Sequence, residues 1–228
     1  MLYDRDIREP LFEFLEETYG KNRIIEEKRI GKSRADVVMV LPDSLVGIEI
    51  KSDADTYARL ESQVKDYNLY FDKNIVVVGT KHAGSIRTHV PQGWGIITVE
   101  QVGNSVDFYV NQDMQANPKS IKKDGTVPVY YMKRQLSFLW RPELVNIQSK
   151  NDMHRYAAKS KAFVIQKIME CVPWDKLKLE ICEELFERDY NQIAATIDAY
   201  RVSKGNKPRR RKRVSKSNAD KVSEDKEV

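Results

Sequence analysis

The clearest pattern of apolar and polar positions lies between residues 31 and 67. Two apolar runs, ADVVMVL and LVGIEIKS, are separated by the turn sequence LPDS at residues 41–44, which predicts two strands joined by a turn. A polar loop, SDADT, comes next, and then a segment with helical spacing that runs to about Phe71. This stretch is therefore predicted to form two strands, a loop and a helix.

Apolar runs on both sides of this stretch extend the pattern. Apolar residues recur at helical spacing across residues 4–19 and stop at Gly20, which predicts a first helix. Further runs at residues 23–30, 74–79, 94–99 and 106–110 predict strands, the last of them at a sheet edge. Helix, three strands, helix and further strands indicate a mixed α/β core.

Beyond residue 110 the sequence turns polar and then helical. Residues 111–128 lose hydrophobic periodicity, whereas apolar stripes resume from about residue 136, with Pro142 and Pro173 marking helix ends. We therefore predict four parts, which are a core over residues 1–115, a linker or surface loop over 116–135, a helical extension over 136–203 and a disordered basic tail over 204–228.

The helical extension allows two interpretations. Leu136, Leu139 and Trp140 form an apolar stripe that would pack on the core, the usual role of such stripes. Alternatively, the extension would be a small DNA-docking module, although acids elsewhere in the segment weigh against this. Its phosphate contacts would be Lys150, Arg155, Lys159, Lys161 and Lys167.

The positive charge of the chain is concentrated at one end. Residues 204–228 hold ten Lys and Arg against four Asp and Glu, whereas the rest holds 29 against 30. The PRRRKR cluster in this segment has almost no apolar neighbours, which predicts a disordered arm that contacts phosphates without reading sequence. A merely solubilising end is the alternative. The body itself gives no global electrostatic argument for nucleic acid.

Composition excludes several classes of protein. No apolar run approaches membrane-spanning length, and the polar N-terminus lacks the pattern of a signal or transit peptide. Cys171 and Cys182 are the only cysteines, and their setting supports neither a disulfide framework nor a zinc site. The sequence therefore predicts a reduced, cytoplasmic protein with no membrane partner.

The candidate chemistry lies on the two central strands. Asp36 stands at the start of the first strand, and Glu49 and Lys51 share one face of the second because strand side chains alternate. Burying such charges without partners is expensive, so a divalent metal bound by Asp36 and Glu49 would explain them. The alternative is an exposed edge strand with Glu49 and Lys51 facing water.

The following helix adds two polar residues. Gln63 and Tyr67 are spaced i, i+4 and therefore lie on one helix face. An amide and a phenol can hold a phosphate, a base edge or the metal ligands themselves. An ordinary polar stripe on an amphipathic helix is the alternative.

Other residues near the two strands are secondary candidates. Glu27 is an extra acid for the metal, and Arg34 precedes Asp36 and could bind phosphate. His82 follows a buried strand and could contact a substrate or transfer a proton, or be a plain loop histidine. Asp55 or Thr56 is predicted to cap the helix that contains Gln63 and Tyr67.

The arrangement Asp36…Glu49-Ile50-Lys51, followed by Gln63-x-x-x-Tyr67, resembles the PD-(D/E)XK nuclease superfamily. More narrowly, the stretches IREPLFEFL, GKSRADVV, GIEIKSDADTYARLESQVKDYNLYFDK, VVVGTKH, VPQGWGIITV and LWRPELV are similar to a family of small bacterial and phage proteins assigned to that superfamily. The resemblance covers residues from about 4 to 190. Ala35 stands where the superfamily name has proline, a position that varies there.

The resemblance implies a restriction-endonuclease-like mixed sheet flanked by helices, and Mg²⁺-dependent cleavage of DNA, with Mn²⁺ as a substitute. Asp36, Glu49 and the Ile50 carbonyl would bind the metal, with Glu27 as a further ligand. Lys51 would position the attacking water or stabilise developing charge. The residues holding the substrate would be Gln63, Tyr67, Arg34 and His82. The first helix sometimes adds a glutamate in this superfamily, and the sequence leaves its identity open.

Several biological readings stay open. The implied setting is DNA repair, recombination or mobile-element biology. The main alternative is a nuclease-fold DNA-binding or regulatory protein that no longer cleaves. A weaker one is an accessory factor that cuts only with a protein partner, and a homodimer is also left open.

Overall fold

The structure is a computed structural model that describes residues 1–189, 199 and 202. Within it, Met1–Arg188 form one compact unit. The basic arm predicted at residues 204–228 lies outside the described residues, as does most of the segment 190–203. Among the described residues, no helix has the length and apolar character needed to cross a membrane.

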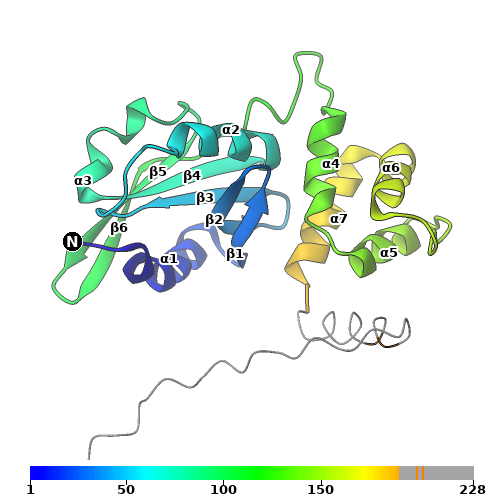
Figure 1. The fold of residues 1–228 in the computed structure, drawn as a ribbon, viewed down its shortest axis with the longest axis horizontal. Helices are drawn as coiled ribbons and strands as arrows, with labels where there is room; N and C mark the ends of the chain where they lie inside the picture. The colour runs from blue at the N-terminus through cyan, green and yellow to red at the C-terminus, as the bar shows by residue number, and fades with distance from the viewer. Residues whose placement is uncertain (190–198, 200–201, 203–228) are drawn as a thin grey trace, which may run out of the picture. The chain divides into compact units, whose positions relative to one another are not determined.

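A six-stranded mixed sheet forms the centre of this unit, and its strands lie in sequence order (Figure 1). The first three strands are antiparallel, the third to fifth are parallel, and the last pair is antiparallel again. The strands are β1 (Arg23–Ile30), β2 (Ser33–Val40), β3 (Leu45–Lys51), β4 (Lys73–Gly79), β5 (Gly95–Val102) and β6 (Ser105–Gln112). The predicted strands and the mixed α/β fold class are confirmed.

Helices cover both faces of the sheet, with α1 (Asp4–Tyr19) and α2 (Leu60–Tyr70) on opposite sides (Figure 1). The apolar face of α1 packs in one core cluster with Val46, Ile48 and Ile50 of β3. Because strand side chains alternate, Glu49 and Lys51 face α2 instead. Gly47 shares that face, where a Cβ would lie 2.2 Å from the ring of Phe71. A glycine therefore lets α2 approach β3.

The start of α2 differs from the prediction. The helix begins at Leu60, and Arg59 at its N-cap makes no side-chain capping bond. The carboxylate of Asp55 instead accepts bonds from Ser52 N at 2.9 Å and Ser52 Oγ at 2.6 Å. The prediction that Asp55 or Thr56 caps α2 is wrong, because Asp55 closes a local turn and the helix starts five residues later.

The chain between the last parallel strands carries α3 (Thr80–Ala83) and the short 3₁₀ helix η1 (Ile86–Thr88). Beyond the sheet, the helical segment begins at Val129 rather than near residue 136, so α4 occupies part of the predicted linker. Pro142 and Pro173 lie at the starts of α5 and α7, as expected of helix punctuation. These helices are α4 (Val129–Ser137), α5 (Arg141–Lys150), α6 (Lys161–Cys171) and α7 (Trp174–Phe186).

These helices pack on the α2 side of the sheet. Leu136 and Leu139 are fully buried in the same core cluster as Tyr67 and Phe71 of the α2 region. The expected packing on the core is therefore confirmed for Leu136 and Leu139. Met1–Arg188 cluster as a single unit, which gives no division to compare with the predicted boundaries. The boundaries between core, linker and extension therefore stay predictions.

Candidate functional site

A buried charged pair on β3 is the centre of the candidate site. Glu49 is 1% exposed and Lys51 is 5% exposed, on a strand whose seven residues are all buried. The ammonium of Lys51 donates to Glu49 Oε1 at 2.5 Å. The alternative of an exposed edge strand is excluded, because β3 lies between β2 and β4 in the middle of the sheet.

Helix α2 places two polar side chains over this pair. Gln63 donates through Nε2 to Glu49 Oε1 and accepts from Lys51 Nζ at 3.1 Å. Tyr67 is completely buried, and its hydroxyl lies 2.7 Å from Glu49 Oε2 and 3.1 Å from the carbonyl oxygen of Ile48. Their i, i+4 spacing therefore brings both residues onto one carboxylate, as the single-face prediction required.

The carboxylate of Asp36 lies beside the pair. Its Oδ2 accepts from the backbone N–H of Ile50 at 2.9 Å, and the N–H of Asp36 donates to the Tyr67 hydroxyl at 3.2 Å. Burial, and then the nearby charge of Glu49, raise the pKa of Asp36 to about 7. Burial and the charge of Glu49 also raise the pKa of Tyr67 well above its ordinary value, so its hydroxyl stays protonated.

The donor chemistry of this cluster fits a small divalent cation. The charge of Glu49 disfavours a charged Asp36, and a cation bound by both carboxylates would offset that repulsion. Within the described residues, no three or more Asp, Glu, His or Cys side chains gather as a metal-binding group. A cation here would therefore rest on Asp36 and Glu49, completed by backbone oxygen or water. Ile50 contacts Asp36 through its N–H, and its carbonyl as a ligand stays a prediction.

Glu27 and Arg34 lie at the outer side of Asp36. The pairing of β1 with β2 matches Glu26 to Val37 and Lys28 to Ala35, so Glu27 falls opposite Asp36. Glu27 has a positive φ of 55°, an uncommon conformation for a glutamate. The exposed Glu27 forms an ion pair with Arg34 at 2.5 Å.

Arg8 of α1 joins this acidic edge and was not among the residues selected from the sequence. Its guanidinium contacts Glu27 Oε1 at 2.7 Å and lies 3.8 Å from Asp36 Oδ1. Burial alone would lower the pKa of Arg8, but Asp4, Asp36 and Glu27 raise it above its ordinary value. The first helix therefore contributes a cation here, and its glutamates at positions 9, 13, 16 and 17 are exposed.

His82 lies away from the acids. It is 6% exposed, its ring packs on Tyr57 with 4.8 Å between centroids, and its Nε2 lies 3.2 Å from the carbonyl oxygen of Asp55. None of the contacts of the described residues joins His82 to Asp36, Glu49 or Lys51. The structure thus brings Asp36, Glu49, Lys51, Gln63 and Tyr67 together, with Glu27 and Arg34 at the edge and His82 apart.

Comparisons with known proteins give one family, one curated sequence match and one solved structure. The family model described as "Bacteriophage P4 protein cII" matches residues 1–200. Protein cII of Enterobacteria phage P4 is 27% identical over 118 residues, which cover 49% of this chain and 44% of that protein. The chain thus matches less than half the length of this curated relative. Among solved structures, Pyrococcus furiosus SfsA in complex with Ca²⁺ is 16% identical, with a TM-score of 0.30, over 46% of this chain and 58% of that chain.

Proposed function

The chain belongs to the Bacteriophage P4 protein cII family, and we propose that this member is a metal-dependent nuclease that hydrolyses phosphodiester bonds in DNA. One observation carries the proposal. Glu49 and Lys51 are buried together in an otherwise apolar strand, with Asp36 beside them. Buried charge is costly to fold around, and perturbed carboxylates gather at functional sites.

The spacing of these residues supports assignment to the PD-(D/E)XK superfamily. Asp36 and Glu49 lie on neighbouring strands β2 and β3, and Gln63 and Tyr67 reach Glu49 from the following helix. These are the placements that the sequence resemblance requires of a metal site. The curated relative is a phage protein, which favours a role in mobile-element biology over other DNA transactions.

Each site residue then has a role in the reaction. Asp36 and Glu49 would hold Mg²⁺, with Mn²⁺ as a substitute, which would supply Lewis-acid stabilisation and a bound water of lowered pKa. Lys51 places a positive charge next to Glu49, where it can orient the attacking water or stabilise a phosphate oxygen. Gln63 is partly exposed and can also contact the substrate backbone.

Tyr67 takes a different role from substrate contact. Because it is completely buried and bonds to Glu49 and Asp36, we assign to it the positioning of the two carboxylates. Packing locks the two χ angles of Tyr67, so its hydroxyl holds a carboxylate more firmly than water would. A supporting residue of a metal site provides this kind of positioning.

A second candidate function is a nuclease-fold DNA-binding or regulatory protein that does not cleave. One observation favours it. The oxygens of Glu49 accept from Lys51, Gln63 and Tyr67, so protein donors alone can satisfy this buried carboxylate. Such a protein would bind DNA but release no products.

The two functions separate in a cleavage panel. Linear duplex, single-stranded, circular and branched DNA, together with RNA, would be incubated with Mg²⁺ or Mn²⁺ at low salt. The parent is expected to release products. Asp36→Ala and Lys51→Ala are each expected to lose activity by about 100-fold or more, which is the loss typical of removed electrostatic stabilisation. Binding without cleavage by all three proteins would favour the regulatory function. Equal cleavage by all three would mean a contaminating nuclease or a misplaced site.

A further inference from the structure

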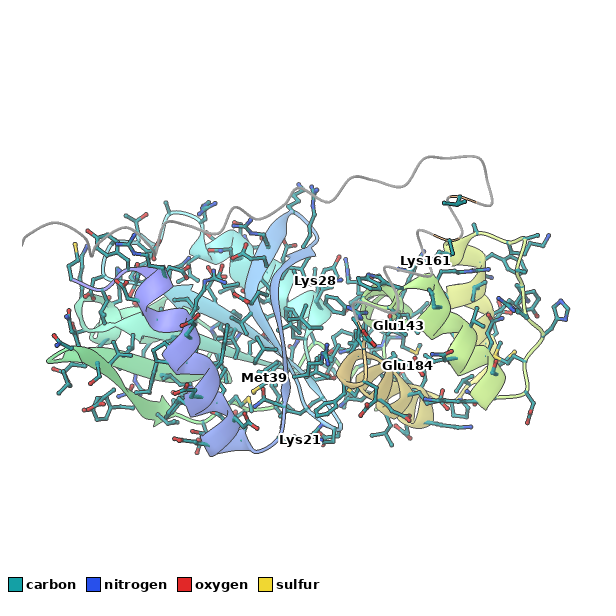
Figure 2. All side chains as sticks on the ribbon, turned by 90° about the horizontal axis from the view of Figure 1, so that it is seen from below. Lys21, Lys28, Met39, Glu143, Lys161 and Glu184 are labelled. Atoms are coloured by element: carbon teal, nitrogen blue, oxygen red, sulfur yellow. The ribbon has the colours of Figure 1, made fainter. Side chains whose placement is uncertain are left out.

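Three cationic side chains from distant parts of the chain converge on one short segment at the end of α4. Arg188 Nη2 donates to the carbonyl oxygen of Phe138 at 3.0 Å, and Lys161 Nζ donates to that of Ser137 at 3.0 Å. Lys28 Nζ lies 5.2 Å from the centre of the Phe138 ring. Figure 2 labels Lys28 and Lys161 with Glu143, the acid of this cluster. We call these four charged residues the Phe138 cluster.

The acid of the Phe138 cluster is already neutralised. Glu143 accepts from Arg188 Nε at 2.6 Å and Nη2 at 2.8 Å, and also from the backbone N–H of Trp140 at 2.5 Å. The ion pair is almost completely buried, with side-chain exposures of 1% and 4%. In the described part of the chain, neither Lys28 nor Lys161 has an acid within the 4 Å distance of an ion pair. Among the described residues, Lys28 and Lys161 therefore have no ion-pair partner of their own.

The positive charges of Lys28 and Lys161 lie in an unfavourable environment, because burial and nearby positive charges both disfavour them. Burial, and then the charges of Arg188 and Lys161, lower the pKa of Lys28 to about 8, while the charge of Glu143 opposes this shift. Burial also lowers the pKa of Lys161, and Arg188 adds to this effect while Glu143 opposes it. An anion held between the two ammonium groups would remove this cost, because an opposite charge favours the charged form of a lysine.

The Phe138 cluster lies next to the strand that carries the candidate site. Lys28 is on β1, at an edge of the sheet, and pairs with Ala35 of β2, the residue that precedes Asp36. Lys28 is partly exposed and Lys161 is exposed, so a large ligand can reach both. A polymer of phosphates that enters the candidate site can therefore extend to these lysines.

We propose that Lys28 and Lys161 form a phosphate-contact site that holds the backbone of the same DNA that the Asp36 and Glu49 centre would cleave. This inference rests on the proposed function. The contact would be electrostatic, since an ammonium group is a compact charge without the planar geometry that reads bases. It would fix the position of the strand and add affinity without sequence preference.

The other lysines of the helical segment make matched controls. Lys150 is paired with Glu183 at 3.0 Å and Glu184 at 2.9 Å, and Lys167 is paired with Glu170 at 2.6 Å. These two lysines were candidates for phosphate contact together with Lys161. Because acids already neutralise them, they offer little attraction to a phosphate.

The test is the salt dependence of DNA binding by the full chain, measured by fluorescence anisotropy of a labelled duplex in EDTA. Removing a lysine that contacts a phosphate lowers the slope of log K against log salt by about 1. The double variant Lys28→Gln/Lys161→Gln is therefore expected to lower the slope by about 2 and to weaken binding at least tenfold at 0.1 M salt. The control Lys150→Gln/Lys167→Gln changes net charge equally and is expected to leave the slope unchanged.

Equal slopes for the parent and the Lys28/Lys161 variant would overturn the inference, as would equal losses in both double variants. Competition by inorganic phosphate alone, with no loss of DNA affinity in the Lys28/Lys161 variant, would mean that the site takes a free anion instead. A thermal melt excludes unfolding as the cause, since removing two repelling charges is expected to leave Tm unchanged or raise it. Failure of the nuclease proposal looks different: the parent would bind with the expected slope but release no products with Mg²⁺.

Discussion

Tyr67→Phe tests whether a buried hydroxyl holds the two candidate ligands in place. Phenylalanine keeps the ring contacts with Phe71 and Trp94, at centroid distances of 5.4 Å and 5.5 Å. It removes the donor to Glu49 Oε2 and the acceptor of the Asp36 N–H. The substitution therefore changes hydrogen bonding and little else.

The expected cost follows from the burial of the groups left behind. A buried polar group without its partner costs about 1–3 kcal/mol, and a charged one costs more. Because Glu49 is a carboxylate that is 1% exposed, we expect a loss of about 3 kcal/mol in the free energy of unfolding. In a protein of this size that loss corresponds to a Tm lower by about 6–12 °C.

Urea unfolding followed by circular dichroism in EDTA measures this loss. Tyr70→Phe is the matched control, because Tyr70 lies on the same helix and, within the described residues, its hydroxyl accepts one exposed bond, from Gly31 N at 3.0 Å. We expect the control to lose less than about 1 kcal/mol, since water can replace that bond. A Tyr67→Phe loss as small as that of the control would refute the assigned positioning role.

Three further predictions concern metal, pH and packing. Saturating Mn²⁺ at 100 times its Kd should add about 2.7 kcal/mol to the free energy of unfolding, measured by thermal melts, and Glu49→Ala should abolish this gain. Without metal, stability should fall as pH rises from about 4 to 8, because folding raises the pKa of Asp36 from 3.8 to about 7 and so favours its protonated form. Asp36→Asn should flatten that profile, and an unchanged profile would contradict the burial of this carboxylate. Gly47→Ala should cost about 2 kcal/mol or more in urea unfolding, since its Cβ would lie 2.2 Å from the rigid ring of Phe71.

The sheet and its central residues were predictable because their signals are local. Apolar alternation along β2 and β3 and the spacing of Gln63 and Tyr67 depend on neighbouring positions in the sequence. The elements could therefore be placed from residue types alone. Burial of Glu49 and Lys51 was one of two interpretations of their apolar run, and the central place of β3 in the sheet decides for it.

Residues whose role depends on tertiary contacts were not predictable in the same way. Arg8 reaches Glu27 and Asp36 across 19 and 28 positions, and no local pattern marks it. Lys150 and Lys161 look alike in the sequence, but only Lys150 meets acids from α7. The turn formed by Asp55 competes with a helix cap for the same carboxylate, and residue type does not decide between them.

The most direct test of the central claim is a Mg²⁺ titration of DNA cleavage by the parent, Glu49→Gln and Glu61→Gln. Glu61 is an exposed residue of α2, paired with Lys65 at 2.6 Å, and so controls for the loss of one carboxylate. We predict Mg²⁺-dependent products from the parent and from Glu61→Gln. The cleavage rate of Glu49→Gln is expected to be lower by about 100-fold or more. Cleavage by Glu49→Gln at the parent rate, or none by the parent at any Mg²⁺ concentration, would contradict the account.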